Sequence, residues 1–211
     1  MPKPDQRNAL EVGERVYLRE PTSRDAAQIV ALNRASRTFH RGWVMPPTDS
    51  GAFVTWMRRC RQSNVKCFLV CRLADGAIVG VFTLSQIVLG MFHSAYLGYY
   101  AERPHDGQGY MTEGMGLVLR YAFTRMTLHR FEANVQPENA ASIALVKRSG
   151  FRLEDFSPRY LKVAGRWRDH QRWAILIDEW RRLRPRPRVP SRDRGRRAPP
   201  GSSSPGRPRS G

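Results

Sequence analysis

Apolar residues recur at helical spacing in four segments of the chain. In "GAFVTWMRRC", residues 51–60, they fall at i, i+3, i+4 and i+7, which predicts a helix with one buried face. The segment after Gly109 also carries apolar residues on one helical face. The helix predicted in "ENAASIALVKRSGF" ends at Gly150, because glycine readily adopts the left-handed conformation. A fourth helix begins near the N-terminus after Thr22 or Ser23, either of which can cap it.

Short β-rich runs lie between these helices. Residues 66–84 hold two of them, joined by Asp75-Gly76, the strongest short-range signal for a hairpin. A third run follows at residues 94–102, so the centre of the chain is predicted to be an antiparallel meander. Single strands are predicted at residues 16–19 and 130–135, and residues 159–177 close the domain as a last hairpin.

The length and composition favour one folded domain. The chain has 211 residues, and 41% of them are apolar, which is enough for a single full core. No run of 18 apolar residues is present, and the N-terminal sequence lacks the apolar centre of a secretory signal, so we expect a cytoplasmic protein. We divide the chain into an N-terminal segment (1–13), a domain (14–180) and a tail (181–211).

Positive charge is concentrated in the tail. Of the net charge of +18, residues 181–211 hold +10, from eleven Arg and one Asp, together with seven of the 15 prolines. The only large aliphatic residues of the tail are Leu183 and Val189. Burying them cannot offset the conformational entropy that the tail would lose on folding, and we therefore expect it to be disordered. Two interpretations remain open. The arginines reflect a GC-rich genome, since Arg outnumbers Lys 32 to 4, or the tail is an arm that binds nucleic acid or the ribosome.

The chain has three cysteines, Cys60, Cys67 and Cys71. No second Cys or His pair follows at the spacing of a zinc site, so we expect no metal. We predict that all three are reduced thiols that serve as small apolar side chains, as in cytosolic proteins.

The segment "RPHDGQGYMTEG", residues 103–114, places Gly107 and Gly109 between a predicted strand and a predicted helix. Glycines there allow backbone N–H groups to converge on one point, and the N-terminus of the helix adds positive potential. These features are typical of an anion site, most often for phosphate. The loop lacks the Gly-Lys-Ser/Thr of a Walker A motif, and Thr112 stands where a dinucleotide fingerprint has its third glycine. Taken alone, the glycine pair is also compatible with a simple turn.

Three segments together carry a family resemblance: "LGYYAERPHDGQGYMTEG", "HRFEANVQPENAASIALVKRSGFRLE" and "RYLKVAGRWRDH". Residues 14–178 resemble the GCN5-related N-acetyltransferase (GNAT) superfamily, and within it the ribosomal-protein-alanine N-acetyltransferases of the RimJ/RimL type. The resemblance implies an α/β fold of the α+β type. Its mixed, mostly antiparallel sheet is flanked by helices, and a splayed strand pair binds acetyl-CoA as the co-substrate.

The resemblance also implies where acetyl-CoA is held. Pantetheine lies along the splayed strand, and backbone N–H groups of the glycine loop bind the pyrophosphate. Pro104 replaces the Gln or Arg that the superfamily often has three residues before the first glycine, which removes only a side-chain contact. Asn139 begins the family's N-x-x-S segment and contacts the pantetheine arm, although Asn is also a favoured helix cap. The implied cofactor-binding residues are Leu97, Gly98, Tyr99, Tyr100, Asp106, Gly107, Gln108, Gly109, Tyr110, Asn139 and Ser142.

The implied reaction is the attack of a neutral amine on the acetyl thioester. Ser142 faces the thiol end and can donate a proton to it, and a backbone N–H near Tyr99 stabilises the oxyanion. The base is left open. The acid of related N-terminal acetyltransferases aligns with Asn134, and Glu132, on the same strand face, either acts through water or is a structural acid. Arg159 stands where another branch of the family has an acid. We therefore expect a catalytic set of Glu132, Asn134, Ser142 and Tyr99 without one indispensable base.

The nature of the acceptor follows from amine chemistry. At pH 7 about a tenth of an α-amino group is neutral, against roughly four parts in ten thousand of a Lys side chain. We therefore expect the acceptor to be a protein N-terminus, such as that of a ribosomal protein. Two alternatives stay open. One is acetylation of a small amine such as an aminoglycoside or a polyamine, whose cations the +8 of residues 1–180 would repel. The other is a non-enzymatic RNA-binding or ribosome-binding protein on the same scaffold, and the retained loop glycines argue against it.

Overall fold

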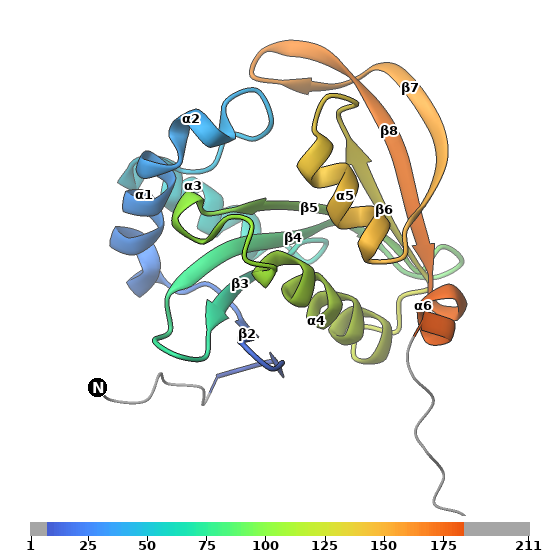
Figure 1. Cartoon of the computed structure of the whole chain (residues 1–211), viewed down its shortest axis with the longest axis horizontal. Coiled ribbons are helices and arrows are strands. Elements are labelled where there is room, and N and C mark those ends of the chain that lie inside the picture. Colours follow the sequence, from blue (N-terminus) through green and yellow to red (C-terminus); the bar gives the residue numbers. More distant parts are fainter. Residues whose placement is uncertain (1–7, 184–211) are drawn as a thin grey trace, which may run out of the picture.

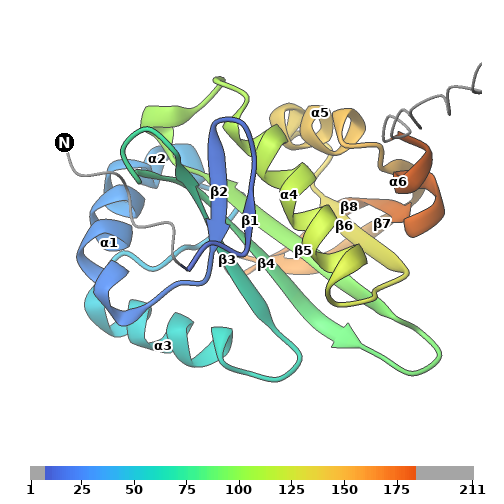
Figure 2. The same cartoon turned by 90° about the horizontal axis from the view of Figure 1, so that it is seen from below.

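The computed structural model describes residues 8–183, which form one mixed sheet with helices on both faces (Figures 1 and 2). The strand order is β1-β2-β3-β4-β5-β6-β8-β7. Neighbouring strands are antiparallel except for β5 and β6, so the sheet is the mixed, mostly antiparallel one that was predicted. The strands are β1 (Glu11–Val12), β2 (Val16–Arg19), β3 (Lys66–Arg72), β4 (Ile78–Val88), β5 (Ser94–Ala101), β6 (Arg130–Val135), β7 (Arg152–Val163) and β8 (Arg166–Leu176).

Two groups of helices cover the two faces of the sheet. Figure 2 shows α1 and α3 on one side of it, and α4 and α5 on the other. The helices are α1 (Ala26–Ala35), α2 (Arg37–His40), α3 (Ser50–Cys60), α4 (Tyr110–Thr124), α5 (Ala140–Arg148) and α6 (Ile177–Leu183), with short 3₁₀ turns η1 (Ser23–Asp25) and η2 (Arg103–His105). Among the described residues, no helix has the length and apolarity needed to cross a membrane.

Side chains of the central strands alternate between two cores. In β3, Phe68 and Val70 join the core under α4 and α5, whereas Leu69 and Cys71 join the core under α1 and α3. This alternation follows from the two-residue period of a strand. Because helices cover both faces, β3 is buried along its whole central part and reads as a continuous apolar run.

Most elements lie where their patterns predict them. The strands at 16–19 and 130–135 and the central meander are confirmed, and Gly76 and Gly150 have φ angles of +75° and +88° as their turn and helix-end positions require. The analysis missed β1 and α2, which are two and four residues long. It also missed the first half of β7, where register shifts interrupt the alternation. Helix α6 was not predicted, and the expected disorder is wrong for residues 181–183, which belong to this helix; the rest of the predicted tail lies outside the described residues.

The cysteine prediction is wrong for two of the three residues. The structure joins Cys60 and Cys67 by a disulfide, because the turn between α3 and β3 brings their Cα atoms to 5.5 Å. Cys71 is a free, buried thiol as predicted, and burial raises its pKa to about 11.

The strands β5 and β6 pair only where they begin. Their partners are Ser94 with Arg130, Ala95 with Phe131 and Tyr96 with Glu132, and the pairing stops there. The outer neighbours continue: β4 pairs with β5 as far as Ala101, and β8 pairs with β6 as far as Val135. From Leu97 onward the two strands therefore splay, and each turns a backbone edge without a strand partner toward the gap.

Gly80 in β4 lets the start of α4 approach the β4–β5 pair. A Cβ atom at residue 80 would lie 2.8 Å from the carbonyl oxygen of Tyr100 and would also collide with Met111 in the first turn of α4. We therefore expect Gly80→Ala to lower the free energy of unfolding by about 1–3 kcal/mol, measured by denaturant titration. Gly116→Ala is the matched control, because Gly116 is an exposed residue of α4 with nothing within 4 Å of a Cβ. It should stabilise the protein by about 0.5–1 kcal/mol. Equal stabilities of the two variants would contradict this account of Gly80.

Candidate functional site

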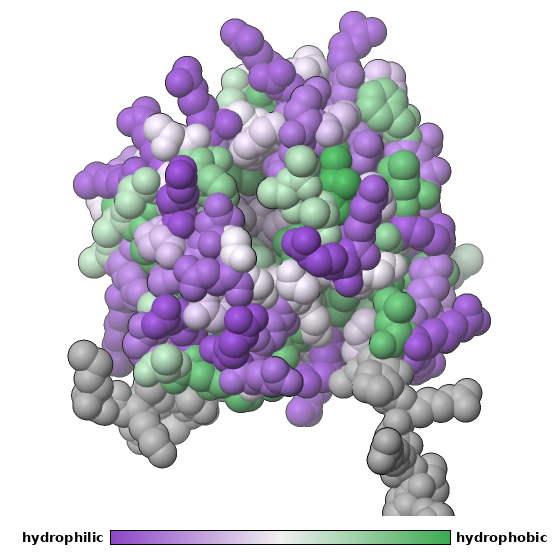
Figure 3. Space-filling view, in the orientation of Figure 1, coloured by the Kyte–Doolittle hydropathy of each residue, from purple (hydrophilic) through white to green (hydrophobic). Residues whose placement is uncertain are grey.

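A cavity of about 1100 Å³ opens beside the splayed strands. Residues 99–101 of β5 form part of its wall, and the loop before α4, the first turn of α4 and the helix α5 form another part. The third part is the segment of residues 39–44, which includes the end of α2. Figure 3 shows the molecule hollowed near the centre of this face. The space between the splayed strands is therefore a cavity, and the residues that line it come from segments far apart in the sequence.

The glycine loop presents free backbone donors to this cavity. Gly107 and Gly109 have φ angles of +71° and +80°, the left-handed region that favours glycine. The N–H groups of residues 107–111 donate to no acceptor among residues 8–183. They lie at the N-terminus of α4, a helix of 15 residues, where the helix dipole adds positive potential. Unpaired donors at such a position form an anion site of the kind that binds phosphate.

Arg15 reaches the same loop from the turn between β1 and β2. Its Nη1 donates to the carbonyl oxygen of Gln108 at 3.1 Å, and its guanidinium lies 5.0 Å from the ring centroid of Tyr110. Glu113 holds Arg15 in place, with 3.2 Å between Nε and Oε2, and also accepts from the backbone N–H groups of Arg15 and Val16. Burial would raise the pKa of Glu113, but these hydrogen bonds outweigh burial and lower it. Arg15 thus adds a fixed positive charge beside the anion site.

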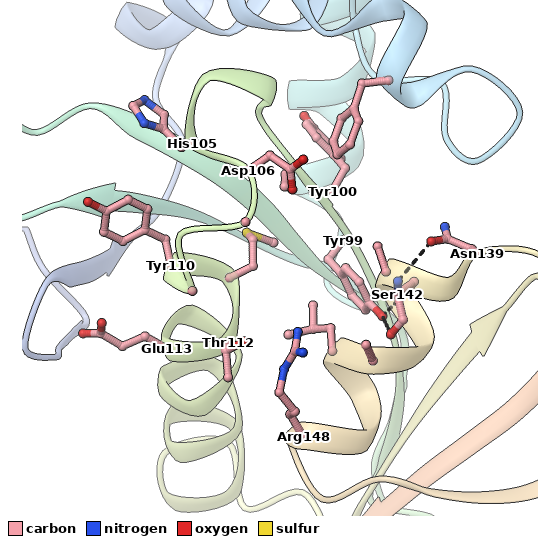
Figure 4. A pocket seen from close by; sticks show the side chains of 18 of the residues that line it. Tyr99, Tyr100, His105, Asp106, Tyr110, Thr112, Glu113, Asn139, Ser142 and Arg148 are labelled. Carbon is pink, nitrogen blue, oxygen red and sulfur yellow. Dashed lines mark hydrogen bonds between the residues drawn. The ribbon is translucent and has the colours of Figure 1, made fainter.

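Tyr99 of β5 and Ser142 of α5 contact each other in the wall of the cavity (Figure 4). The phenol oxygen lies 2.5 Å from Ser142 Oγ. Burial raises the pKa of Tyr99 to about 12, which the hydrogen bond to Ser142 only partly opposes, so the phenol stays protonated at neutral pH. Asn139 begins α5 as its cap, since its Oδ1 accepts from the N–H of Ser142 at 3.0 Å. The capping interpretation of Asn139 is confirmed, and the cap fixes the backbone of Ser142.

The far end of the cavity is aromatic. Phe39, Trp43 and Val44 line it together with His40, whose Nε2 lies 2.8 Å from the carbonyl oxygen of Ala101. A carbonyl oxygen only accepts, so this nitrogen carries the proton, and burial lowers the pKa of His40. The ring is therefore neutral at pH 7.

Three hydrogen bonds attach this aromatic wall and the residue before α2 to the ends of β5 and β6. Besides the bond from His40, the side chain of Gln136, just after β6, donates to the carbonyl oxygen of Gly42 at 2.9 Å. Ser36 donates to the carboxyl group of Glu102 at 2.9 Å. Burial raises the pKa of Glu102 to about 7, with the Ser36 hydrogen bond acting weakly in the opposite direction.

Most of the residues predicted to bind the cofactor surround the cavity. Leu97 is instead buried in the core, Gly98 does not reach the cavity, and the side chain of Gln108 bonds to the carbonyl oxygen of Pro104 at 3.3 Å. Those that line it are Tyr99, Tyr100, Asp106, Gly107, Gly109, Tyr110, Asn139 and Ser142.

Glu132 and Asn134 share one face of β6, as alternation predicts, but neither lines the cavity. Glu132 accepts from Arg130 Nε at 2.9 Å, and its other oxygen lies 3.8 Å from Arg172. Asn134 Oδ1 is buried without a hydrogen-bond partner among the described residues. The carboxylate of Glu132 is thus engaged by two arginines, which suits a structural role.

Three groups in the cavity wall were not predicted from the sequence: Arg15, Arg148 and the aromatic segment of residues 39–44. Helical spacing from Ala141 in the N-x-x-S segment would have found Arg148, because it lies seven residues later on the same face of α5. Arg15 is more than 90 residues from the glycine loop, and no local pattern connects the two. Within residues 8–183, His, Cys, Asp and Glu side chains form no group of three that could hold a metal ion.

Comparison with known proteins gives one consistent result. The family model described as acetyltransferase (GNAT) domain matches residues 15–152. A probable N-acetyltransferase of Bacillus subtilis, YjcK, is 32% identical over 172 residues, which are 78% of this chain and 95% of that protein. The ribosomal protein uS5-alanine N-acetyltransferase of Escherichia coli is 30% identical over 175 residues, 79% of this chain and 90% of that protein. Among solved structures, Mycobacterium smegmatis RimJ in complex with CoA-disulfide matches with a TM-score of 0.71 and 31% identity, covering 78% of this chain and 83% of that one.

Proposed function

The chain belongs to the GNAT family of acetyltransferases, and on that premise we propose that it transfers the acetyl group of acetyl-CoA to the N-terminal α-amino group of a ribosomal protein. One observation carries the proposal. A single cavity joins a glycine loop with free N–H groups, the splayed edge of β5 and the Tyr99–Ser142 pair. These are the three parts that a bound acetyl thioester requires: an anion site, an edge for its amide chain and a polar group at its sulfur.

The cavity suits acetyl-CoA along its whole length. The N–H groups of residues 107–111 suit the pyrophosphate, and Arg15 and Arg148 supply positive charge for the phosphates. The edge of β5 beyond Leu97 has no strand partner on the β6 side, so its backbone groups are free for the amides of pantetheine. The thioester then reaches Ser142. The complex of RimJ with CoA-disulfide supports the same type of ligand.

The chemistry needs little covalent help from the protein. The nitrogen–carbon bond forms first and gives a tetrahedral intermediate. Its carbon–sulfur bond then breaks, the electron pair leaves on sulfur, and the proton released by nitrogen balances the proton that completes the thiol. A backbone N–H on the β5 edge near Tyr99 stabilises the oxyanion of the tetrahedral intermediate. Either oxygen can donate in the hydrogen bond between Tyr99 and Ser142 Oγ; when the phenol donates, the hydroxyl proton of Ser142 is free to point at the departing sulfur. Tyr99 thus orients Ser142.

The acceptor end favours one amine on a polypeptide. Phe39, Trp43 and Val44 offer apolar contacts to a peptide chain, and the wall segment of residues 39–44 contains no carboxylate. A polyamine has several cationic groups to neutralise and gains little from such a wall. The E. coli relative that acts on the alanine of ribosomal protein uS5 supports a protein N-terminus.

Acetyl-CoA turnover against a panel of acceptors tests the proposed function. N-terminal peptides of ribosomal proteins should be acetylated faster than spermidine, an aminoglycoside or a peptide with an acetylated N-terminus and a free lysine side chain. The rate should rise with pH to about 8 and then level off, because the neutral fraction of an α-amine limits the reaction. Mass spectrometry locates the acetyl group. Faster turnover of spermidine than of every peptide would contradict the proposal.

The anion site is tested at Gly109. A side chain there is strained at φ +80°, and its Cβ would lie 3.2 Å from Arg15 Nη2. Gly109→Val should weaken acetyl-CoA binding at least tenfold in calorimetry, because it crowds the phosphate position and displaces Arg15. Gly165→Val is the matched control, since Gly165 has the same φ angle of +80° in the turn between β7 and β8, away from the cavity. A similar loss of affinity in both variants would attribute the effect to backbone strain and not to the site.

The Tyr99–Ser142 pair is tested by a double-mutant cycle on turnover. Ser142→Ala should cost about ten- to a hundredfold in kcat, since general-acid assistance is worth that much. Tyr99→Phe should cost less, roughly three- to tenfold, and nothing further in the Ser142→Ala background, because Tyr99 acts through Ser142. Glu132→Gln should cost less than about tenfold, as expected for a carboxylate engaged by Arg130. A loss beyond roughly a thousandfold for Glu132→Gln, at unchanged acetyl-CoA affinity, would identify Glu132 as a required base.

A further inference from the structure

The described lysines and arginines fall into two classes by their ion pairs. Where β6 and β7 begin, next to α6, the arginines are paired with acids. Arg130 bonds to Glu154, and Arg152 lies 2.7 Å from Glu179. The arginines of the helical layer over the opposite half of the sheet differ, because they are exposed and form no ion pair with a described residue. They are Arg24, Arg34, Arg37, Arg41, Arg58, Arg59 and Arg61.

The acids of this helical layer are already used. Asp25 bonds to Arg19 at 2.6 Å, and Asp49 caps α3 by accepting from the N–H of Ala52 at 2.8 Å. Neither carboxylate neutralises an arginine on the outer surface. Residues 24–61 hold seven arginines and two acids, so this segment keeps a net charge of +5, and none of its arginines forms an ion pair with a described residue.

The end of the β7–β8 hairpin repeats this arrangement. Its one acid, Asp169, accepts from the backbone N–H of Arg159 at 2.7 Å and forms no ion pair among the described residues. The exposed cations there are Arg159, Lys162, Arg166 and Arg168, which likewise lack ion pairs with described residues. We call these four residues and the seven arginines of residues 24–61 the basic rim.

Part of each half of the basic rim lies near the acceptor end of the cavity, although no rim residue lines the cavity itself. Arg37 and Arg41 flank the wall residues Phe39 and His40 in sequence. Figure 1 shows the β7–β8 hairpin arching above the gap toward the loop that follows α2. In Figure 3 hydrophilic side chains project along this margin, above the hollow. An acceptor that enters the cavity therefore passes between two uncompensated positive segments.

Such a rim selects by charge. It repels free cations, and it raises the local concentration and association rate of a polyanion. Ten of the eleven side chains are arginines, whose planar guanidinium groups match the oxygens of a phosphate in pairs. The rim thus combines the sign of charge and the donor geometry that a phosphate backbone requires.

We propose that the basic rim binds the phosphate backbone of RNA beside the acceptor end of the cavity. The choice of RNA rests on the proposed function, in which the acceptor is the N-terminus of a ribosomal protein. Such a protein is itself basic, and the rim would repel it in free form. Its bound RNA supplies the negative charge that brings the N-terminus to the cavity.

The test is binding of fluorescein-labelled single-stranded oligouridine to the full chain, followed by anisotropy as a function of salt concentration. Two variants each remove two charges from the rim, Arg37→Gln with Arg41→Gln, and Arg166→Gln with Arg168→Gln. The control, Arg125→Gln with Arg182→Gln, removes two exposed charges near the ends of α4 and α6 that also lack described ion pairs. Each rim variant should bind about five- to tenfold more weakly at physiological salt and lower the log–log salt slope by roughly 1.4, and the control should change neither.

Three outcomes would overturn the proposal. Equal losses in the rim variants and the control would show that binding follows net charge and not the rim. Tighter rim-dependent binding of a polyglutamate peptide would identify an acidic protein as the partner, and a preference for oligothymidine would identify DNA.

Acetylation of a short uncharged peptide, measured in the same variants, separates this proposal from the proposed function. Turnover should stay at the wild-type level in the variant Arg166→Gln with Arg168→Gln while RNA binding falls. If the wild-type chain acetylates no peptide, the proposed function fails, and the binding result still decides whether the rim is a phosphate site.

Discussion

The parting of β5 and β6 is the constraint on which the rest of the structure depends. Two neighbouring strands of a sheet normally continue to pair, because unpaired backbone groups in the interior are costly. Here each strand keeps its outer partner, β4 for β5 and β8 for β6. When β5 and β6 separate, each strand therefore still has backbone hydrogen bonds along its outer edge. The backbone groups that remain unpaired face the cavity, where a ligand with amide groups can satisfy them. The binding site is thus an interruption of the sheet that its neighbours hold open.

The elements around the gap are joined by contacts that also place the chemistry. Gly80 allows the β4–β5 pair and the start of α4 to approach closely, which sets the glycine loop at one end of the gap. Ser142 is fixed by the cap of Asn139 and meets Tyr99 across the gap. The hydrogen bond between them ties α5 to β5 where pairing with β6 has ended. The contact that joins α5 to β5 therefore also positions the Ser142 hydroxyl at the cavity.

Local physics made much of this site predictable from the sequence. Glycines at positive φ, an Asn cap and a strand of six alternating residues depend on neighbours a few positions away, so Gly107, Gly109, Asn139 and the face shared by Glu132 and Asn134 follow from short segments. Contacts between distant segments leave no local pattern. The reach of Arg15 to the glycine loop, the aromatic wall around Phe39 and the Cys60–Cys67 disulfide all depend on how whole elements pack. The partners of Glu132 show both cases, since Arg130 is two residues away and Arg172 comes from another strand.

The aromatic wall is held by hydrogen bonds that do not involve the arginines beside it. The fold can therefore keep these arginines without ion pairs next to the cavity. Hydrogen bonds of Ser36, His40 and Gln136 hold that wall, and none of them uses an arginine side chain. On the other side of the gap, the carboxylates of Glu132, Glu154 and Glu179 are engaged with arginines of the sheet and are not available to the rim. Arg37 and Arg41 therefore take part in none of the described contacts that hold the wall. Like charges at close range weaken a fold, and a surface that keeps them unpaired is stabilised most by a partner that supplies the missing negative charge.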